Sequence, residues 1–345
     1  MFLEEKLKKG GLLDKLTSLD GPTGYEGQVR DFIKTEVAPY VDEVTVDRMG
    51  NVIVHKKGNG KRVVIDAHMD EVGFIITGYN EDGTLRFSPL GGINAKIIPS
   101  KTVLIGANKI PGVIGAKPIH LQGKDEREKG LTYNDCCIDI GAHCRKQCEN
   151  LIDLGEYVVF DTEYDEFGEG LLKGKAFDDR MGCFVLMEAL KENYNIDLYG
   201  VFSVQEEIGE RGAFVGAINT KADLGIALEG TICADMPSVP KHLRATEVGK
   251  GPAISIMDLT SIFDDEIAED IMAVGEKLGI PYQRRKAIAG GNNAATFHGT
   301  GSGAKIAALS VPCRYIHSSV SVAAKSDVEN AVKLLVNYLK SLSEN

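Results

Sequence analysis

The chain has 345 residues, of which 43% are hydrophobic and 26% charged. These values exclude an intrinsically disordered chain, and the length predicts about two domains. Lys and Arg number 39 against 50 Asp and Glu, and the resulting net charge of −11 argues against nucleic-acid and membrane partners, since both present anionic surfaces.

Several features predict a cytoplasmic location. The first residues lack the basic segment and apolar run of a signal peptide, and no stretch approaches the roughly 18 consecutive apolar residues of a transmembrane helix. The 7 cysteines do not follow a disulfide-rich spacing, so we interpret them as reduced thiols.

The N-terminal segment predicts helices followed by strands. Leucines recur at helical spacing between residues 12 and 19, and a second apolar stripe from Val29 to Val37 ends before Pro39. Three strand-like runs follow, at 44–46, 52–54 and 63–67. The last run is almost entirely apolar, as expected of a strand that is buried on both faces of a sheet.

After residue 71 the pattern changes to short β-like runs separated by glycine and proline. The segments 74–79 and 84–87 flank Asn80-Glu81-Asp82-Gly83, an arrangement that is typical of a β-hairpin. Apart from one helical turn near 144–150, no long helical pattern returns before about residue 180. We therefore predict that residues 71–164 form an inserted all-β domain, either a small barrel or a sandwich.

From about residue 175 helices and strands alternate along the chain. Helical patterns cover 180–192, 267–278 and 328–342, and strand patterns cover 198–204, 224–228, 253–256 and 304–309. This alternation predicts an α/β domain with a mixed, mostly parallel sheet flanked by helices. The domain is discontinuous, since it is assembled from residues 1–70 and 165–345 around the insertion.

Acidic and histidine side chains gather where the predicted strands end or the next helix begins. They are His68, Asp70, Asp178, Asp179, Glu206, Glu207, Glu229 and His317. Because ligands bind at the carboxyl ends of the strands in open α/β sheets, we expect these segments to meet in one crevice. Imidazole with carboxylate suits Zn²⁺, Co²⁺ or Mn²⁺, and a carboxylate can bridge two such ions that share a water and polarise a carbonyl.

Each of these motifs alone also has a simpler explanation. His68 and Asp70 can form a hydrogen-bonded strand end, adjacent aspartates are common helix caps, and adjacent glutamates usually face solvent. Glu229 can merely end its strand, and His317 can be a hydrogen-bonded core histidine. The shared placement of the motifs is what favours a metal centre over these separate explanations.

Four motifs make the chain resemble the TET-type aminopeptidases, the forty-second metallopeptidase family, which are cytoplasmic dinuclear enzymes. The motifs are Ala67-His68-Met69-Asp70-Glu71-Val72-Gly73-Phe74, Gly174-Lys175-Ala176-Phe177-Asp178-Asp179-Arg180, Gln205-Glu206-Glu207-Ile208-Gly209-Glu210-Arg211-Gly212-Ala213 and Tyr315-Ile316-His317-Ser318. Their order and spacing extend over nearly the whole chain. The resemblance implies a metal-dependent aminopeptidase that hydrolyses N-terminal residues from peptides.

The resemblance also implies the metal ligands. His68 and Glu229 would bind one ion, Glu207 and His317 would bind the other, and Asp178 would bridge both. The implied cofactors are two divalent ions per subunit, with Zn²⁺ as the first choice and Co²⁺ or Mn²⁺ as alternatives.

Two further residues receive roles from the resemblance. Glu206 matches the general base of the family, and Asp70 matches the carboxylate that orients the first metal-binding histidine. The chain departs from the family pattern where Asn292-Asn293 replace Thr-Asp, and where Glu229 stands in place of a common Asp. It also lacks the usual Glu three residues after His317-Ser318.

The resemblance implies a β-barrel insertion that makes dimer contacts, and tetrahedral shells of twelve subunits. We therefore predict a homo-oligomer built from dimers, with a tetrahedral dodecamer as one assembly that the resemblance implies. Two other functions fit the same residues: a di-metal carboxypeptidase or deacylase, and an inactive metal-binding homologue that kept the fold. Substrates with a free amino terminus distinguish the first alternative, and a broad peptide panel distinguishes the second.

Overall fold

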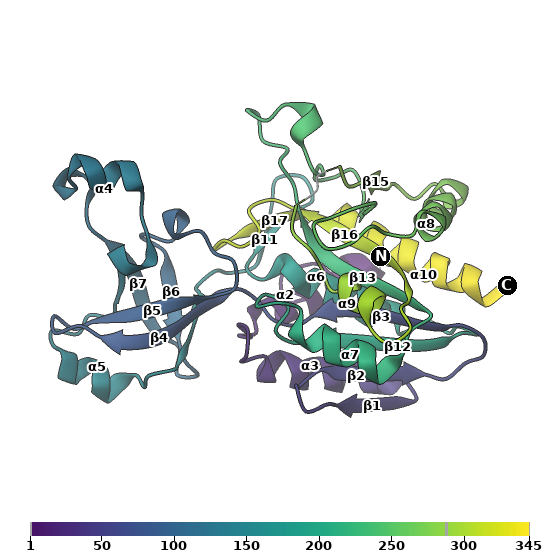
Figure 1. The fold of residues 1–345 in the computed structure, drawn as a ribbon, viewed down its shortest axis with the longest axis horizontal. Coiled ribbons are helices and arrows are strands. Elements are labelled where there is room, and N and C mark those ends of the chain that lie inside the picture. Colours follow the sequence, from purple (N-terminus) through teal and green to yellow (C-terminus); the bar gives the residue numbers. More distant parts are fainter. Residues whose placement is uncertain (1, 287–288, 345) are drawn as a thin grey trace.

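The computed structural model describes residues 2–286 and 289–344, which form two lobes joined by a narrow neck (Figure 1). Within these residues the larger lobe contains an eight-stranded mixed sheet of order β1-β2-β12-β3-β13-β16-β14-β15. Its strands are β1 (Glu43–Val46), β2 (Val52–Lys56), β3 (Arg62–His68), β12 (Asp197–Ser203), β13 (Leu224–Ile232), β14 (Ala253–Ile254), β15 (Gln283–Arg284) and β16 (Lys305–Cys313).

The centre of this sheet is parallel and its margins contain antiparallel pairs. The pairs β12–β3, β3–β13 and β13–β16 are parallel, whereas β1–β2, β2–β12 and β14–β16 are antiparallel. The predicted mixed, mostly parallel sheet is confirmed. His68 lies opposite Ser203 and Glu229 opposite Ser310, so parallel strands carry both candidate ligands to the same edge.

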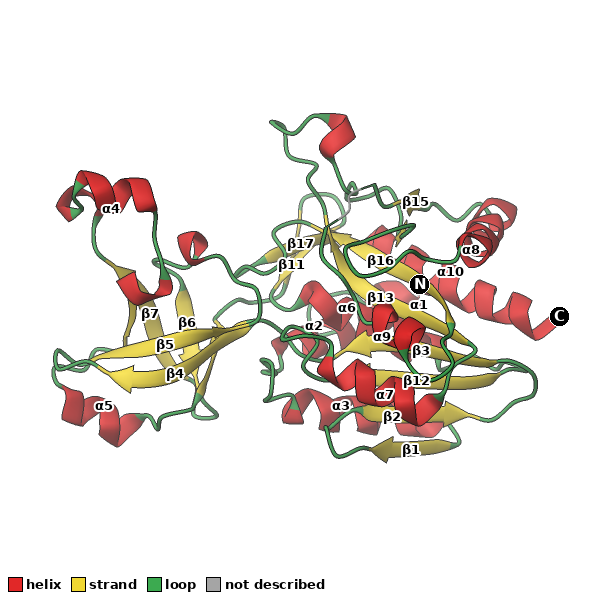
Figure 2. Cartoon of the chain, in the orientation of Figure 1, coloured by secondary structure: helices red, strands yellow, loops and turns green. Residues whose placement is uncertain are grey.

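Helices cover both faces of the large sheet (Figure 2). They are α1 (Phe2–Lys6), α2 (Leu12–Ser18), α3 (Gly27–Val37), α6 (Phe177–Ala189), α7 (Arg211–Thr220), α8 (Asp265–Leu278), α9 (Ala294–Gly299) and α10 (Lys325–Glu344). Val63 and Ile65 of β3 belong to the hydrophobic cluster under α6 and α10, whereas Val64 belongs to the cluster under α7 and α9. Alternate side chains of β3 therefore point into two cores, which explains its apolar sequence.

The smaller lobe is a closed β-barrel of order β4-β5-β8-β7-β6-β9 with its own hydrophobic core. Its strands are β4 (Gly73–Tyr79), β5 (Thr84–Leu90), β6 (Thr102–Ile105), β7 (Ile110–Ala116), β8 (Cys136–Asp139) and β9 (Tyr157–Phe160). The inserted β architecture is confirmed as a barrel rather than a sandwich. The domain division at 71 and 164, and the use of this lobe in dimer contacts, stay predictions.

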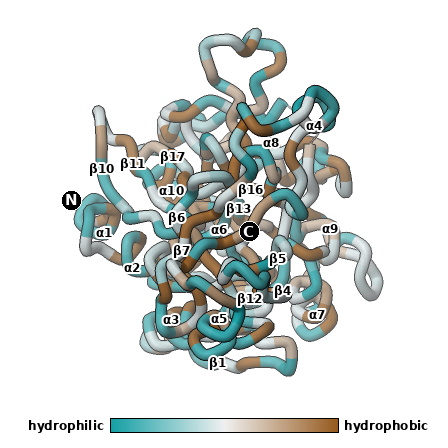
Figure 3. The backbone as a smooth tube through the Cα atoms, turned by 90° about the vertical axis from the view of Figure 1, so that its left-hand side faces the viewer, coloured by the Kyte–Doolittle hydropathy of each residue, from teal (hydrophilic) through white to brown (hydrophobic). Residues whose placement is uncertain are grey.

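The barrel lobe also carries two short helices on its exterior, α4 (Lys124–Lys129) and α5 (Arg145–Leu151). Both are hydrophilic along most of their length, as the teal colour in Figure 3 shows. The second of them matches the helical turn expected near 144–150. Among the helices that the structure describes, none combines the length and the hydrophobicity that crossing a membrane requires.

The sequence patterns did not predict α7, α9 or a small sheet made of β10 (Asp165–Phe167), β11 (Leu171–Gly174) and β17 (Ser321–Ala324). Helix α7 was missed because it contains glycine at two positions, which lowers helix propensity. Packing explains the glycine at position 216, since a Cβ there would lie 2.9 Å from Val201 Cγ1 in β12. Close packing against the sheet stabilises this helix in spite of its composition.

Candidate metal centre

The predicted candidates meet at one edge of the large sheet. His68 ends β3, Glu229 lies near the end of β13, and Glu206 and Glu207 follow β12. The other two come from the start of α6, which contributes Asp178, and from the loop between β16 and β17, which contributes His317. These six residues line one cavity of about 570 Å³. Asp70 does not line the cavity and lies fully buried behind it.

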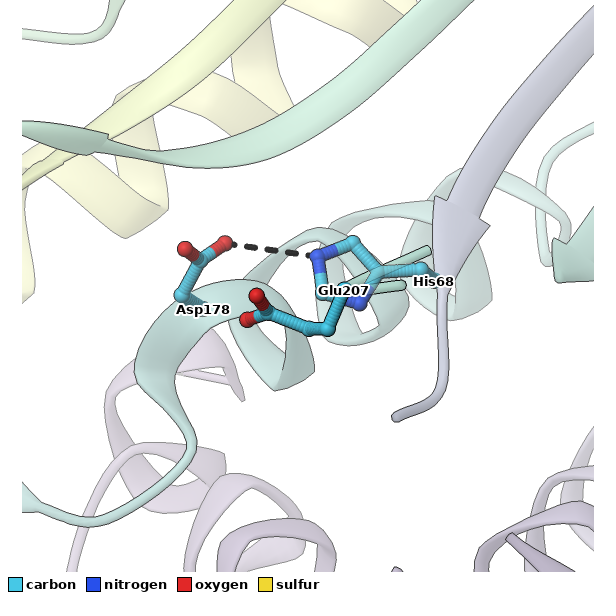
Figure 4. A group of neighbouring side chains, drawn as sticks. All are labelled: His68, Asp178 and Glu207. Carbon is cyan, nitrogen blue, oxygen red and sulfur yellow. Dashed lines mark ion pairs between the residues drawn. The ribbon is translucent and has the colours of Figure 1, made fainter. Parts of the chain in front are cut away.

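Asp178 lies between the two histidines. Its Oδ1 is 3.4 Å from Nε2 of His68, and its Oδ2 is 3.3 Å from Nε2 of His317 (Figure 4 shows the His68 side). Each oxygen of one carboxylate therefore faces a different imidazole, which is the arrangement a bridging ligand requires.

A second carboxylate lies beside each histidine. Glu229 Oε2 lies 3.6 Å from Nε2 of His68, and Glu207 Oε1 lies 3.3 Å from Nε2 of His317. By these distances His68 lies beside Glu229 and His317 beside Glu207, with Asp178 next to both, although ligand atoms of His68, Asp178 and Glu207 also lie within 4.8 Å of one another. This is the grouping that the resemblance implied for two ions.

Unpaired buried oxygens show that these side chains fit divalent cations. Asp178 Oδ1 and Glu229 Oε1 are buried and have no hydrogen-bond partner. Buried polar atoms are normally paired, so two unpaired carboxylate oxygens at one site are explained by cations that they would bind. One imidazole and two carboxylates per ion are a donor set that Zn²⁺, Co²⁺ and Mn²⁺ accept.

Asp179 also lies close enough to His68 and Glu229 to form a ligand group on distance alone. However, both of its oxygens already accept backbone hydrogen bonds. Oδ1 accepts from the amide of Gly182 at 2.9 Å, and Oδ2 accepts from the amide of His68 at 3.2 Å. Asp179 therefore fixes the start of α6 to the end of β3, whereas its neighbour Asp178 keeps an unpaired oxygen toward the site.

Asp70 connects the first histidine to the glutamate pair. Its Oδ1 lies 3.4 Å from Nδ1 of His68 and accepts from the amide of Glu206 at 3.0 Å. Its Oδ2 accepts from the amide of Glu207 at 3.2 Å and from the hydroxyl of Thr23 at 2.7 Å. The hydrogen bond of His68 Nδ1 goes to the backbone carbonyl of Asp70 at 3.1 Å, so this residue orients the imidazole through its main chain while its carboxylate holds the backbone of both glutamates.

Several carboxylates lie close together at this site, and three of them have raised pKa values. Burial, opposed by histidine charges and reinforced by nearby carboxylates, raises the pKa of Glu206 to about 8 and that of Glu207 to about 7. Burial also raises the pKa of Glu229 well above its ordinary value. Cations bound among these groups would stabilise their ionised forms.

The backbone adopts left-handed conformations next to several of these residues. The φ angles are +55° at Ala176, +57° at Gln205, +61° at Tyr315 and +57° at His317. Residues with side chains rarely adopt this conformation, and each instance costs on the order of 1–3 kcal/mol. Such strain persists where the surrounding structure holds the chain firmly, and here it accompanies three of the segments that carry candidate ligands.

Comparison with known proteins identifies the family. The sequence model of the M42 glutamyl aminopeptidases matches residues 50–334. The chain belongs to the M42 aminopeptidase family. The resemblance predicted from the sequence motifs is confirmed, and this M42 chain is a peptide hydrolase of the aminopeptidase class.

Relatives of the M42 chain cover almost its full length. An aminopeptidase from Desulfurococcus kamchatkensis has a TM-score of 0.93 at 34% identity, covering 99% of this chain and 96% of that chain. A lysyl aminopeptidase from Pyrococcus furiosus is 32% identical over 340 residues, which is 96% of each chain. The TET1 peptidase of Pyrococcus horikoshii, which can assemble into a tetrahedron or a large octahedral shell, has a TM-score of 0.83 at 33% identity, covering 94% and 97% of the two chains.

The two asparagines that depart from the family pattern occupy different environments in the M42 chain. Asn292 lines the cavity and donates to Oδ2 of Asp258 at 3.1 Å. Asn293 is fully buried behind the site, where it donates to Oδ1 of Asp66 at 2.6 Å and to the hydroxyl of Ser203 at 3.0 Å. Only Asn292 can therefore contact a substrate in the cavity.

Metal binding by the M42 chain is expected to tighten between about pH 6 and pH 9. Burial lowers the pKa of His317, but its hydrogen bond to Asp178 and the charge of Glu207 outweigh burial and raise the pKa to about 9. The pKa of Glu207 is about 7. Below pH 7 both groups are protonated, between 7 and 9 only the imidazole is, and an ion must displace those protons.

Titration calorimetry of Zn²⁺ in buffers of different ionisation enthalpy measures this proton release. We expect more protons released per ion at the acidic end than at the alkaline end. A metal affinity that stays constant over the range would contradict the assignment of these two residues as ligands.

Proposed function

We propose that the M42 chain is an aminopeptidase that holds two divalent ions and uses Glu206 as general base to release N-terminal residues from peptides. The observation that carries the proposal is the position of Asp178, whose two oxygens each face a different histidine. A carboxylate that is placed in this way serves two ions rather than one.

The residues that would hold the ions are His68 with Glu229 for the first, His317 with Glu207 for the second, and Asp178 for both. When bound, the ions would lower the pKa of a shared water and polarise the peptide carbonyl. We propose Zn²⁺ as the native metal, with Co²⁺ or Mn²⁺ as alternatives, since nitrogen and oxygen donors suit all three.

Glu206 is suited to transfer a proton at this site. It lines the cavity, and its amide is held by Asp70, so its position is fixed relative to the ligands. Burial raises its pKa to about 8, and neighbouring cations would lower this pKa and so favour the ionised carboxylate that can accept a proton. Glu206 then accepts a proton from the attacking water and delivers it to the amine that leaves.

Arg285 is a candidate determinant of substrate preference in the same cavity. Its Nε donates to the hydroxyl of Thr231 at 3.0 Å and its Nη2 donates to the carbonyl of Ala289. Of the described ion pairs within 4.0 Å, none involves this half-buried guanidinium, although the cavity wall contains Asp258. The hydrogen-bond partners of this half-buried cation are neutral, and Asp258 and Glu229 act on its charge only at a distance, so it favours a carboxylate from the substrate.

Replacing Arg285 by glutamine is expected to lower kcat/KM for substrates with N-terminal Glu or Asp by about 10- to 100-fold relative to substrates with N-terminal Ala, because a charge-assisted hydrogen bond is lost. Aminoacyl anilides measure this ratio directly. The matched control is Arg284→Gln, because Arg284 is the exposed neighbour and does not line the cavity. An equal loss on acidic and neutral substrates would contradict the role.

The relatives and the composition support a proposal for the assembly and the location. Because the TET1 peptidase can assemble into closed shells, we propose a homo-oligomer built from dimers that extends to a tetrahedral dodecamer. We propose peptides as substrates and the cytoplasm as the compartment. Analytical ultracentrifugation tests the assembly, and a monomer at all concentrations would contradict it.

Metal analysis combined with a substrate panel tests the proposed function. We expect about two divalent ions per subunit and hydrolysis confined to substrates with a free amino terminus. Hydrolysis of N-acylated amino acids or of C-terminal residues instead would favour the carboxypeptidase or deacylase. Two bound ions without hydrolysis of any peptide would favour an inactive homologue.

A further inference from the structure

A turn of the barrel lobe reaches the metal centre. Gly91 and Gly92 directly follow β5, and Gly92 lines the same cavity as the candidate ligands. The carbonyl of Gly92 accepts a hydrogen bond from Nδ1 of His317 at 3.0 Å. Since a carbonyl can only accept, Nδ1 carries a proton, and Nε2, which faces Asp178, is the nitrogen that would bind an ion after losing its own proton.

The same turn packs against the other ligand of the second ion. Gly91 has a φ of +83°, and a Cβ there would lie 3.1 Å from Cβ of Glu207, 3.2 Å from its Oε2 and 2.9 Å from Cγ1 of Val72. The backbone of the turn therefore passes directly over the Glu207 side chain. Any side chain at this position would press on a candidate ligand.

The segment that leaves the barrel holds the loop of His317 as well. The hydroxyl of Thr162, two residues after the end of β9, donates to the carbonyl of Ser319 at 2.6 Å. Ser319 lies two residues beyond His317 on the same loop. The barrel lobe thus contacts the second ligand set at the Gly91-Gly92 turn and at Thr162.

The first ligand set is held differently. His68 and Glu229 lie within β3 and β13, which pair with each other and with the neighbouring strands of the large sheet. The sheet register fixes these two residues without the barrel. The two ions would therefore depend on different parts of the molecule.

We propose that the Gly91-Gly92 turn of the barrel lobe is a positioning element for the second ion. Affinity for this ion then depends on how the barrel packs against the larger lobe, whereas affinity for the first ion does not. The inference rests on the proposed two-ion site. The turn acts through Glu207 and His317, since it sets their orientation and itself provides no metal ligand.

The test compares Gly91→Ala with Gly141→Ala by titrating each metal-free protein with Co²⁺ and Zn²⁺, using calorimetry and the visible absorption of bound Co²⁺. Gly141 is a matched control because it lies in the barrel lobe with a φ of +75° and has no atom within 4 Å of an added Cβ. Both variants incur the left-handed backbone cost, and only Gly91→Ala presses on Glu207.

We expect Gly91→Ala to weaken one of two Co²⁺ sites by about 10- to 100-fold and to leave the other unchanged, as is typical when the support of a ligand is disturbed. Gly141→Ala is expected to bind both ions like the wild type. Thermal unfolding of the metal-free proteins shows whether the two variants fold equally well. If Gly91→Ala does not fold, Thr162→Val provides the test instead, because it removes only the hydroxyl bound to Ser319. We expect this variant to weaken the same ion site to a smaller degree.

Wild-type affinity at both sites, or an equal loss at both, in Gly91→Ala or in the deciding Thr162→Val variant would overturn the inference. If the wild-type protein binds two ions, such a result leaves the proposed function intact. A wild type that binds fewer than two ions would overturn the proposed function, and the inference with it.

Discussion

Glu206→Gln is expected to bind both divalent ions with wild-type affinity and to hydrolyse peptides about 10²- to 10⁴-fold more slowly, the range lost when a general base is removed. The amide keeps the size of the carboxylate but cannot accept the proton from water. Glu206 is outside both ligand sets, so metal binding should not change. Metal analysis and kcat on an aminoacyl anilide measure the two effects separately.

Substitution of the neighbouring Glu207 is expected to affect metal binding, which the Glu206 variant should leave unchanged. Glu207→Gln should lose affinity for the second ion, because Glu207 Oε1 lies 3.3 Å from Nε2 of His317. Glu169→Gln, at an exposed glutamate outside the cavity, should change neither property. If Glu206→Gln retains most of its turnover, the general base is another group.

Asp178→Asn is expected to weaken binding of both ions by at least about 100-fold and to abolish hydrolysis. The substitution replaces one carboxylate oxygen with an amide nitrogen that cannot serve as a ligand. Because each oxygen faces a different histidine, with separations of 3.4 and 3.3 Å, one ion would lose this ligand outright and the other would keep only a neutral amide oxygen in place of a charged carboxylate. Titration of the metal-free variant with Zn²⁺ measures both affinities.

A control for this variant is Asp270→Asn, which changes an exposed aspartate on α8 and should leave metal binding unchanged. Full wild-type affinity for one of the two ions in Asp178→Asn would show that Asp178 serves only the other ion and is not a bridge. Retention of both ions would contradict the assignment of Asp178 altogether.

Much of the architecture was predictable because its signals are local. The buried run at 63–67 indicated a central strand, and the turn at 80–83 indicated the first hairpin of the barrel. Helix α7 was not predictable in this way. Its glycines lower helix propensity, and only the close approach of Gly216 to Val201 explains why they are present.

The candidate site was predictable in part for the same reason. Strand ends located His68, Glu207 and Glu229, and the family motifs suggested how to divide them between two ions. Asp179 shows the limit of such reasoning, because only its hydrogen bonds to Gly182 and the amide of His68 distinguish it from its neighbour Asp178. Arg285 shows the same limit, because only the tertiary structure brings it into the cavity beside the candidate ligands.

The sequence by itself determined the class of sheet, the inserted β module, the family and the set of candidate ligands, since these depend on periodicity and on motifs within short segments. The tertiary structure alone decided which oxygen faces which imidazole and which turn of the barrel lobe reaches His317. The contact between Gly92 and His317 joins positions 225 residues apart, and no local pattern encodes such a contact. Only packing of the barrel against the sheet brings that carbonyl to the imidazole.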